Sequence, residues 1–432
     1  MTINIKNLFR SGKKISQMGE FQEVKHIEGV QVSAVSADLY KSRREDLALF
    51  YFPEGANYAV AYTQNSIVSE SIVWNRENTK NNIKALVVNT KNANTFTGDQ
   101  GLNSLNEIAK KLIDSLKKLE LENSYEKSKI KDLIFASTGV IGEKFPAEEI
   151  LSSIPNLVEN LRINQNKLIW MKMASAIMTT DTKPKVASSE IKIGDKIVRI
   201  SGIAKGSGMI APNLATMLSF IFTDADISAA VLNKYLNKVL YSTFNAITVD
   251  SDTSTNDMVA IFSTKKIKSK KLNIVSSKEG IKFEKALHTV CLDLAKQIVV
   301  DGEGAKKFIT IKIINSDSPE RAKKIAFSIA NSPLVKTAIA GEDPNWGRIL
   351  MGVGKSSEEL DPKKIIIKLG DFIVAERGRI SDNYNEEKLK EYMEWDSILI
   401  TVDLKQGKEE YECYTCDFTH DYIDINAHYR RS

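Results

Sequence analysis

Residues 205–222 read KGSGMIAPNLATMLSFIF, and this stretch decides how the rest of the chain is interpreted. Its glycines, Pro212 and Asn213 predict a loop, and the apolar, β-prone run Met217–Phe222 predicts a strand that follows it. Thr216 stands at the junction between the two. The stretch therefore predicts a loop-to-strand entry with a candidate nucleophile at the point of entry.

Thr216 needs help to act as a nucleophile, because a threonine hydroxyl is weak at neutral pH without a base nearby. Cleavage between Ala215 and Thr216 would free an α-amine with an unperturbed pKa of about 8, so that one residue would supply both nucleophile and base. By residue type alone, a threonine that simply opens a strand is the favoured interpretation. The glycines after Lys205 lack the spacing of a P-loop, so a phosphate cradle is not expected.

Outward from this stretch, β-prone apolar runs alternate with helical patterns, which predicts an α/β protein. Helices are predicted over 104–119, 147–161, 229–244, 281–299, 319–330 and 386–395. Strands are predicted over 83–88, 133–136, 198–203, 307–314, 364–369 and 397–404. The only linker-like composition is the charged helix-to-strand connection 121–131, so the domain limits stay soft.

Composition narrows the class of protein. The chain has 432 residues, of which 42% are hydrophobic and 27% charged, which is enough apolar material for two or more cores. Its longest apolar stretches are interrupted by polar residues, so no membrane span is expected, and without a secretory h-region the cytoplasm is the expected location. The net charge of +5 comes from scattered lysines, which does not indicate a nucleic-acid partner.

Two features resemble parts of metal sites. Cys413 and Cys416 have the spacing of half a zinc site, but with Cys291 and four histidines as the only possible supplements, residues of a strand and its turn are the better interpretation. The acidic stretch 250–257, with Asp250, Asp252, Asn256 and Asp257, lacks the glycine and final glutamate of a calcium loop, and a structural loop is expected. We therefore predict no metal site.

The 205–222 stretch resembles the self-cleavage segment of the ornithine acetyltransferase (ArgJ) family. The resemblance extends over nearly the whole chain, in the segments ASTGVIG (136–142), AIMTTDT (176–182), ITVDSDTSTND (247–257), DGEG (301–304), SPLVKTAI (332–339) and GEDPNWGR (341–348). Agreement at that many ordered sites is not expected by chance.

The resemblance implies an α/β fold, a layered α-β-β-α sandwich with a smaller C-terminal α/β lobe. It also implies autocleavage into an α chain of residues 1–215 and a β chain of residues 216–432 that begins with the nucleophile. Two copies of each chain would form a heterotetramer. The implied partners are small-molecule substrates, with neither nucleic acid nor membrane.

The implied reaction moves the acetyl group of N2-acetylornithine to glutamate through an acetyl-Thr216 intermediate and needs no cofactor. Some family members also accept acetyl-coenzyme A; the sequence does not separate the two forms, and we favour the single-donor form. A self-cleaving amidohydrolase or aminopeptidase of the same fold class stays an alternative, as does a binding protein that has lost cleavage. 

The resemblance also assigns site residues. Beside Thr216, Thr138 and Gly139 would form the oxyanion hole, in keeping with a hydroxyl and a backbone N–H that follow a strand. The substrate-binding set would be Thr179 or Thr180, Lys205, Thr216, Glu303, Asn426 and Ser432. A cation for the substrate carboxylate and an acid for its side-chain amine are what this substrate demands.

Several positions depart from the family's pattern or lie at its edge. Ser432 stands one residue later than the family's terminal hydroxyl, so its place in the set is the least supported. Lys91, Thr95, Phe96 and Lys306 differ from the usual family residues, which bears on fine substrate preference. Trp346 and Arg348 are expected to pack beside the site.

Overall fold

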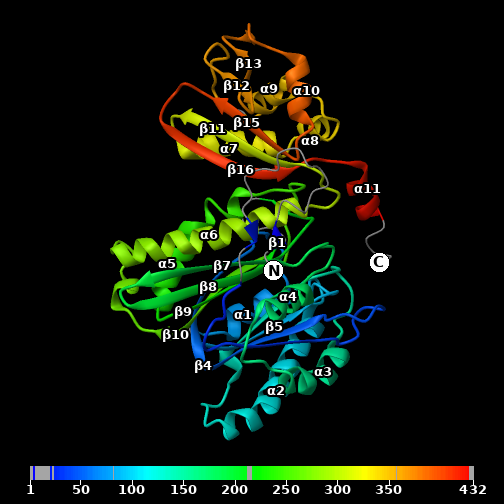
Figure 1. Ribbon diagram of the computed structural model, residues 1–432. Coiled ribbons are helices and arrows are strands. Elements are labelled where there is room, and N and C mark those ends of the chain that lie inside the picture. Colours follow the sequence, from blue (N-terminus) through cyan, green and yellow to red (C-terminus); the bar gives the residue numbers. More distant parts are fainter. Residues whose placement is uncertain are drawn as a thin grey trace.

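The computed structural model describes residues 3–4, 20–21, 24–80, 82–211, 217–356 and 358–427 (Figure 1). They form two α/β parts that follow one another along the chain. The first contains an eight-stranded sheet and the second a six-stranded sheet. A two-stranded antiparallel ribbon, β1 (Ile3–Asn4) and β2 (Glu20–Phe21), precedes both.

The eight-stranded sheet has the strand order β6-β5-β4-β10-β9-β8-β7, with β3 also paired to β4. Its strands are β3 (Gln31–Val35), β4 (Leu47–Tyr62), β5 (Asn82–Asn89), β6 (Leu133–Ser137), β7 (Lys185–Ile193), β8 (Lys196–Lys205), β9 (Leu218–Ala225) and β10 (Met258–Ile267). Parallel pairing occurs between β5 and β6 and between β9 and β10. The remaining neighbours are antiparallel.

The 16-residue strand β4 turns this sheet into two layers. Its first part pairs with β3 and β5 and its last part with β10, with a register shift between Tyr51 and Ala56. The bulge bends the strand, so that its two halves belong to different layers. Aromatic rings meet between the layers: Phe50 stacks on Phe222 at 4.9 Å between ring centroids, and Phe52 on Phe262 at 5.1 Å.

Helices cover both outer faces of this pair of layers. The helices α1 (Glu70–Asn78), α2 (Gly98–Glu122) and α3 (Ala147–Glu159) pack on one side, and α5 (Ala229–Leu240) and α6 (Lys278–Val300) on the other (Figure 1). The helix α4 (Lys167–Ala176) inserts Trp170 into the inner core, 5.4 Å from the Phe222 ring. The predicted α-β-β-α sandwich is therefore confirmed.

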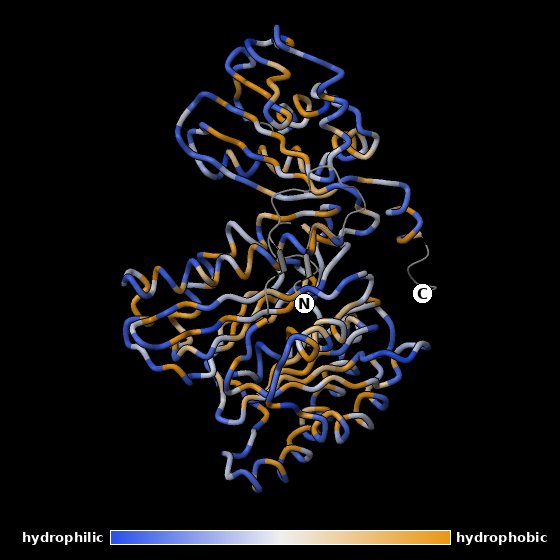
Figure 2. Tube along the Cα trace, in the orientation of Figure 1, coloured by the Kyte–Doolittle hydropathy of each residue, from blue (hydrophilic) through white to orange (hydrophobic). Residues whose placement is uncertain are grey.

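The C-terminal lobe has its own core. Its sheet has the order β14-β13-β12-β15-β11-β16. The strands are β11 (Phe308–Ser316), β12 (Ile366–Leu369), β13 (Phe372–Glu376), β14 (Arg379–Ile380), β15 (Ser397–Asp403) and β16 (Glu409–Cys416), and the helices are α7 (Pro319–Ala330), α8 (Pro333–Ala340), α9 (Trp346–Gly354) and α10 (Glu386–Met393). Apolar segments gather inside both parts (Figure 2), and the predicted smaller lobe is confirmed.

The last helix, α11 (His420–Ala427), leaves the lobe after β16 and extends back toward the sandwich (Figure 1). The two parts also touch through β16, where Tyr414 forms an isolated β-bridge with Ile247 of the sandwich. Residues far apart in sequence therefore meet where the sandwich faces the lobe.

Most predicted elements are present, with differences at their ends. The helix predicted over 229–244 ends at Leu240, because Thr243 adopts a non-helical backbone conformation and turns its hydroxyl to the Val239 carbonyl. The strand β4 escaped prediction because its first half is buried on both faces and shows no alternation. The connection 121–131 joins α2 to β6 within the sandwich, whereas the change between the two parts falls between α6 and β11.

The cysteines behave as strand and helix residues. Cys413 and Cys416 lie buried in β16, as predicted, and Cys291 is buried in α6. Among the described residues, no group of three histidine, cysteine or acidic side chains could hold a metal ion. Within the same residues, no helix combines the length and apolar composition that a bilayer span requires.

Candidate active site

One cavity collects the predicted site residues that the structure describes. It is lined by Ala93, Thr138, Gly139, Ile141, Thr179, Thr180, Lys205, Gly208, Met209, Ser254, Asn256, Glu303 and Asn426. Seven of these were singled out from sequence: Thr138, Gly139, Thr179, Thr180, Lys205, Glu303 and Asn426. Ala215, Thr216 and Ser432 lie outside the described residues.

The turn after β6 presents two hydrogen-bond donors to the cavity, the Gly139 N–H and the Thr138 hydroxyl. The N–H of Thr138 donates to the Asn89 carbonyl at 3.1 Å and that of Val140 to the Lys91 carbonyl at 2.9 Å. The Gly139 N–H between them has no acceptor among the described residues. A free N–H beside a threonine hydroxyl is the donor pair that an oxyanion hole requires.

Only glycine fits at position 139. Its backbone has φ +137°, and a Cβ there would lie 2.1 Å from the carbonyl carbon of Lys91. The turn is therefore pressed against the 91–92 backbone, which fixes the direction of the Gly139 N–H. Asn256 fastens the same corner, since its Nδ2 donates to the Ala93 carbonyl at 2.5 Å and to the Ser137 carbonyl at 2.8 Å.

Lys205 ends β8 and places a cation at the floor of the cavity. Its side chain is buried, with Nζ 2.8 Å from the Thr179 hydroxyl and 3.3 Å from the Thr138 hydroxyl. Burial lowers the pKa of Lys205, and the charge of Asp181 opposes that shift most strongly. Thr180 differs from Thr179, because its hydroxyl pairs with Ser207 at 2.7 Å. Of the two threonines, Thr179 is therefore the one joined to Lys205.

Glu303 supplies the acid. Its residue is 7% exposed, its N–H donates to the Ser207 carbonyl at 2.9 Å, and its Oε2 accepts from Asn426 Nδ2 at 2.7 Å. Gly208 makes room for it, because a Cβ there would lie 2.3 Å from Glu303 Oε2. Among its described lining residues, the cavity thus holds one cation and one carboxylate, which matches a ligand that carries both charges.

Asn426 reaches the cavity because α11 docks on the 301–306 loop. The Thr419 hydroxyl donates to the Gly304 carbonyl at 2.7 Å, and Lys306 pairs with Asp421 at 3.1 Å. The Tyr422 hydroxyl donates to Asp250 at 3.3 Å. The structural role expected for the 250–257 loop is confirmed by this contact, and Asp250 also accepts the N–H groups of Met209 and Ile210.

Asp257 anchors the start of β9. The Met217 N–H donates to its Oδ1 at 2.8 Å, and Leu218 pairs with Lys205 across the strands, so β9 begins beside the cavity. Burial raises the pKa of Asp257 well above its usual range. Its Oδ2 has no hydrogen-bond partner among the described residues.

Other expectations need correction. Trp346 and Arg348 do not line the cavity: Trp346 packs against the core of the C-terminal lobe, and Arg348 donates to the Leu334 carbonyl. Their segment belongs to α9, whose apolar side chains are drawn into that separate core. Phe96 is 81% exposed, and the backbone of Lys91 lies against the turn at Gly139.

Sequence reasoning missed a buried ion network behind the cavity, formed by Asp181, Lys185 and Asp301. Lys185 lies 2.7 Å from Asp181 and 2.6 Å from Asp301. A signal was present, since Asp181 stands inside the AIMTTDT segment and Asp301 opens DGEG. The pairing itself joins positions 116 residues apart and is not visible in the sequence.

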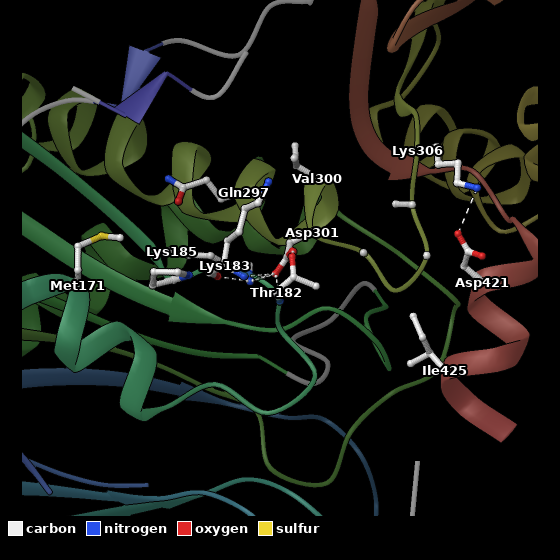
Figure 3. A pocket seen from close by; sticks show the side chains of 14 residues that line it. Met171, Thr182, Lys183, Lys185, Gln297, Val300, Asp301, Lys306, Asp421 and Ile425 are labelled. Carbon is white, nitrogen blue, oxygen red and sulfur yellow. Dashed lines mark hydrogen bonds and ion pairs between the residues drawn. The ribbon is translucent and has the colours of Figure 1, made fainter. Parts of the chain in front are cut away.

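A second cavity, of about 480 Å³, adjoins this network (Figure 3). Its lining includes Lys183, Lys185, Asp301, Lys306 and Ile425. The segments that carry Thr182 and Asp301 therefore separate two cavities, with Glu303 and Asn426 on the side of the first.

Comparison with known proteins places the chain among relatives over nearly its full length. A model of the ArgJ family matches residues 31–431. "Arginine biosynthesis bifunctional protein ArgJ" of Gluconobacter oxydans (strain 621H) is 43% identical, covering 94% of this chain and 92% of that protein. The protein of the same name from Caulobacter vibrioides is 40% identical, covering 95% and 99%.

Two solved structures share part of the chain. The ArgJ crystal structure from Bacillus halodurans is 38% identical and covers 49% of this chain and 99% of that one, with a TM-score of 0.46. Ornithine acetyltransferase complexed with ornithine, from Mycobacterium tuberculosis, is 26% identical and covers 45% and 96%, with a TM-score of 0.37.

Proposed function

Because the chain belongs to the ArgJ family, we propose that it is an ornithine acetyltransferase of arginine biosynthesis, which moves the acetyl group of N2-acetylornithine to glutamate. The observation that carries the proposal is the cavity itself. It combines a free N–H at Gly139, the hydroxyl of Thr138, a buried cation at Lys205 and a carboxylate at Glu303. These groups suit an acyl transfer on an amino acid that bears two charges.

In the first half-reaction, the Thr216 hydroxyl attacks the acetyl carbonyl carbon and gives its proton to the α-amine of the same residue. The carbonyl oxygen becomes an oxyanion, which the Thr138 hydroxyl and the Gly139 N–H stabilise. The C–N bond then breaks, and the departing ornithine amine takes the proton from the terminal ammonium. Acetyl-Thr216 and free ornithine result.

The second half-reaction runs the same steps in reverse with glutamate. Its amine attacks the acetyl ester, the oxyanion forms in the same place, and Thr216 leaves as the restored hydroxyl. One amide bond is broken and a similar one is made. The exchange is therefore close to thermoneutral and needs no cofactor.

The base in this scheme requires the chain to cut itself before Thr216, giving an α chain of residues 1–215 and a β chain of residues 216–432. Thr216 is bonded to Met217, whose N–H donates to Asp257 and which directly precedes β9. The first residue of β9, Leu218, pairs with Lys205. The positive charge of Lys205 lowers the pKa of a nearby amine and favours its neutral form. This arrangement supports an amine base in this part of the cavity.

Substrate binding follows from the charges in the cavity. Lys205, with Thr179 beside it, suits the substrate α-carboxylate, and Glu303, oriented by Asn426, suits the side-chain ammonium of ornithine. Thr180 lines the same wall. We include Ser432 as a further contact, on the family resemblance alone.

We extend the proposal to a second donor, acetyl-coenzyme A, because relatives with 40–43% identity are named bifunctional. Two copies of each chain would assemble as a heterotetramer. The proposed location is the cytoplasm, in keeping with a biosynthetic enzyme of small, charged metabolites.

Intact-mass analysis under denaturing conditions, joined to an acetyl-transfer assay, tests the proposal. We expect the wild type to split between Ala215 and Thr216 and to make N-acetylglutamate, whereas Thr216→Ala stays a single 48.2 kDa chain without activity. Thr216→Ser is the matched control, since it keeps a hydroxyl and should still split. A wild type that stays whole would rule out the terminal-amine mechanism, and acetate release faster than transfer to glutamate would indicate a hydrolase instead.

A further inference from the structure

The ion network behind the cavity contains three charged side chains that the mechanism above does not use. Lys185 opens β7, and its Nζ lies 2.7 Å from Asp181 Oδ1 and 2.6 Å from Asp301 Oδ2. The side chains are 2%, 0% and 6% exposed, respectively. Buried charges are costly unless each is paired and hydrogen-bonded, so such a cluster is retained only where the pairing is nearly complete.

Asp181 uses its remaining hydrogen-bonding capacity on two substrate-binding segments. Its Oδ2 accepts the N–H of Thr179 at 3.1 Å, and its Oδ1 accepts the N–H of Gly206 at 2.6 Å. One carboxylate therefore fixes the backbone at Thr179 and the residue that follows Lys205.

Asp301 connects the segment that carries Glu303 to the segment 179–182. Its carboxylate accepts the N–H of Thr182 at 3.0 Å and also the Thr182 hydroxyl. It stands two residues before Glu303, in the turn that carries that acid into the cavity. Lys185 joins the two carboxylates, as the dashed lines in Figure 3 show for Asp301, and thereby links the segments 179–182, 205–206 and 301–303.

We propose that Lys185, together with Asp181 and Asp301, is a positioning residue for substrate binding, which holds Thr179, Lys205 and Glu303 in register and balances the buried charge of Lys205. The proposal rests on the proposed function, because it concerns the same cavity. In this proposal none of the three side chains touches the substrate.

The charges that face each member define how the network responds to pH. Lys205 faces Asp181, Lys185, Glu303 and Asp257, and burial lowers its pKa despite the nearby carboxylates. Asp181 faces Lys185 and Lys205, and although burial acts to raise its pKa, these cations hold it below its usual range. Lys185 faces Asp181 and Asp301, with Lys183 close to Asp301.

Lys185 and Lys205 carry two positive charges, and Asp181 and Asp301 two negative ones. Removing one member leaves an uncompensated charge, with opposite consequences for a cation and an anion. Loss of the Lys185 charge raises the pKa of Asp181, so that Asp181 becomes protonated as the pH falls. Loss of the Asp301 charge acts through Lys185, because Asp181 is then the one remaining carboxylate of the pair that faces Lys185. The Lys185 cation, which lowers the pKa of Lys205, is then less compensated, so that Lys205 becomes neutral at a lower pH.

The test compares Lys185→Met, Asp301→Asn and the double variant, each purified as the full chain, by kcat/KM for N2-acetylornithine between pH 5 and 10. In the wild type we expect an acid limb with a slope of one, set by the terminal amine. Lys185→Met should steepen the acid limb toward a slope of two. Its kcat/KM should be about 10-fold below that of the wild type at pH 6 and less than about 2-fold below it at pH 9. Asp301→Asn should instead shift the basic limb to lower pH.

The double variant restores the balance of charge, so its profile should lie closer to the wild type than the product of the two single effects predicts. If Lys185→Met does not fold, as judged by its thermal transition, the basic limb of Asp301→Asn decides alone. Profiles that keep the wild-type shape, or that drop equally at every pH, would overturn the inference. A wild type without acetyl transfer would instead refute the proposed function.

Discussion

At the scale of single residues, Gly139 shows how closely the cavity is built. Its φ of +137° and its contact with the Lys91 backbone exclude any side chain. The neighbouring Gly142 also has a positive φ, +79°, but a Cβ there would meet nothing within 4 Å. Alanine at position 142 would therefore add backbone strain alone, whereas alanine at position 139 would add strain and also displace the turn.

We predict that Gly139→Ala lowers acetyl transfer by about 100-fold or more, the usual cost of losing one oxyanion-hole donor. Gly142→Ala should keep most of the activity, because it adds strain without a clash. Steady-state rates of both variants, with thermal transitions to verify folding, check this. Equal losses in the two variants would mean that the direction of the Gly139 N–H is unimportant.

Asp257 leads to a prediction about stability and pH. Burial raises its pKa in the folded state above that of the unfolded chain, so the folded state holds a proton that the unfolded state releases. Stability should then fall as the pH rises from the unfolded pKa of about 3.8 through the folded value. Acidic groups with a lowered pKa, such as Asp181, act in the opposite direction.

Asp257→Asn cannot release a proton, so this part of the pH dependence should vanish. We expect the difference in Tm between Asp257→Asn and the wild type to shift in favour of the variant as the pH rises from 5 to 8. Asp114→Asn, a change on the exposed face of α2, serves as the control and should show little slope. A difference in Tm that stays constant with pH would contradict the raised pKa.

At the scale of elements, α11 connects the C-terminus to the site. It meets the 301–306 loop so closely that a Cβ on Gly304 would lie 2.5 Å from the Tyr422 nitrogen. Through this contact Asn426 reaches Glu303. The helix therefore orients a side chain that belongs to a segment more than 100 residues earlier in the chain.

Ending the chain after Thr419 should raise KM for N2-acetylornithine by about 10-fold, since one hydrogen bond to a charged group is typically worth about 1.5–3 kcal/mol. Self-cleavage should persist, because Thr138, Gly139 and Lys205 lie elsewhere. Kinetics and intact mass of the truncated chain check both expectations. A chain that ends after Ala427 loses Ser432 but keeps α11. Its KM for N2-acetylornithine measures how much of the effect comes from the segment that contains Ser432.

At the scale of the whole molecule, the proposed cut falls between strands that pair with each other. β8 precedes it and β9 follows it, and Ile203 of one strand pairs with Phe220 of the other. The inner core likewise combines Phe50 from before the cut with Phe222 and Phe262 from after it. Neither chain could keep its share of this core alone.

We therefore predict that the two chains stay together after cleavage and separate only when the protein unfolds. Native mass spectrometry should show no free chain and, for the proposed heterotetramer, a mass of about 96 kDa, twice the 48.2 kDa of one full sequence. A species of 48.2 kDa would keep the association but contradict the tetramer. Free 215- or 217-residue chains (432 − 215 = 217) in native buffer would contradict the shared core.

The sequence by itself determined the α/β class and most helices and strands, and the resemblance of its ordered motifs to the ArgJ family implied the residues that meet in the cavity. Local patterns carry that information because helix and strand periodicity and turn residues act over short distances. The bend of β4 that connects the two layers, the docking of α11 on Gly304 and the pairing of Lys185 with Asp301 were decided only by the tertiary structure. Each joins segments far apart in the chain, and burial rather than local preference selects them: a charge such as Lys185 acquires its role only where its partners are enclosed with it.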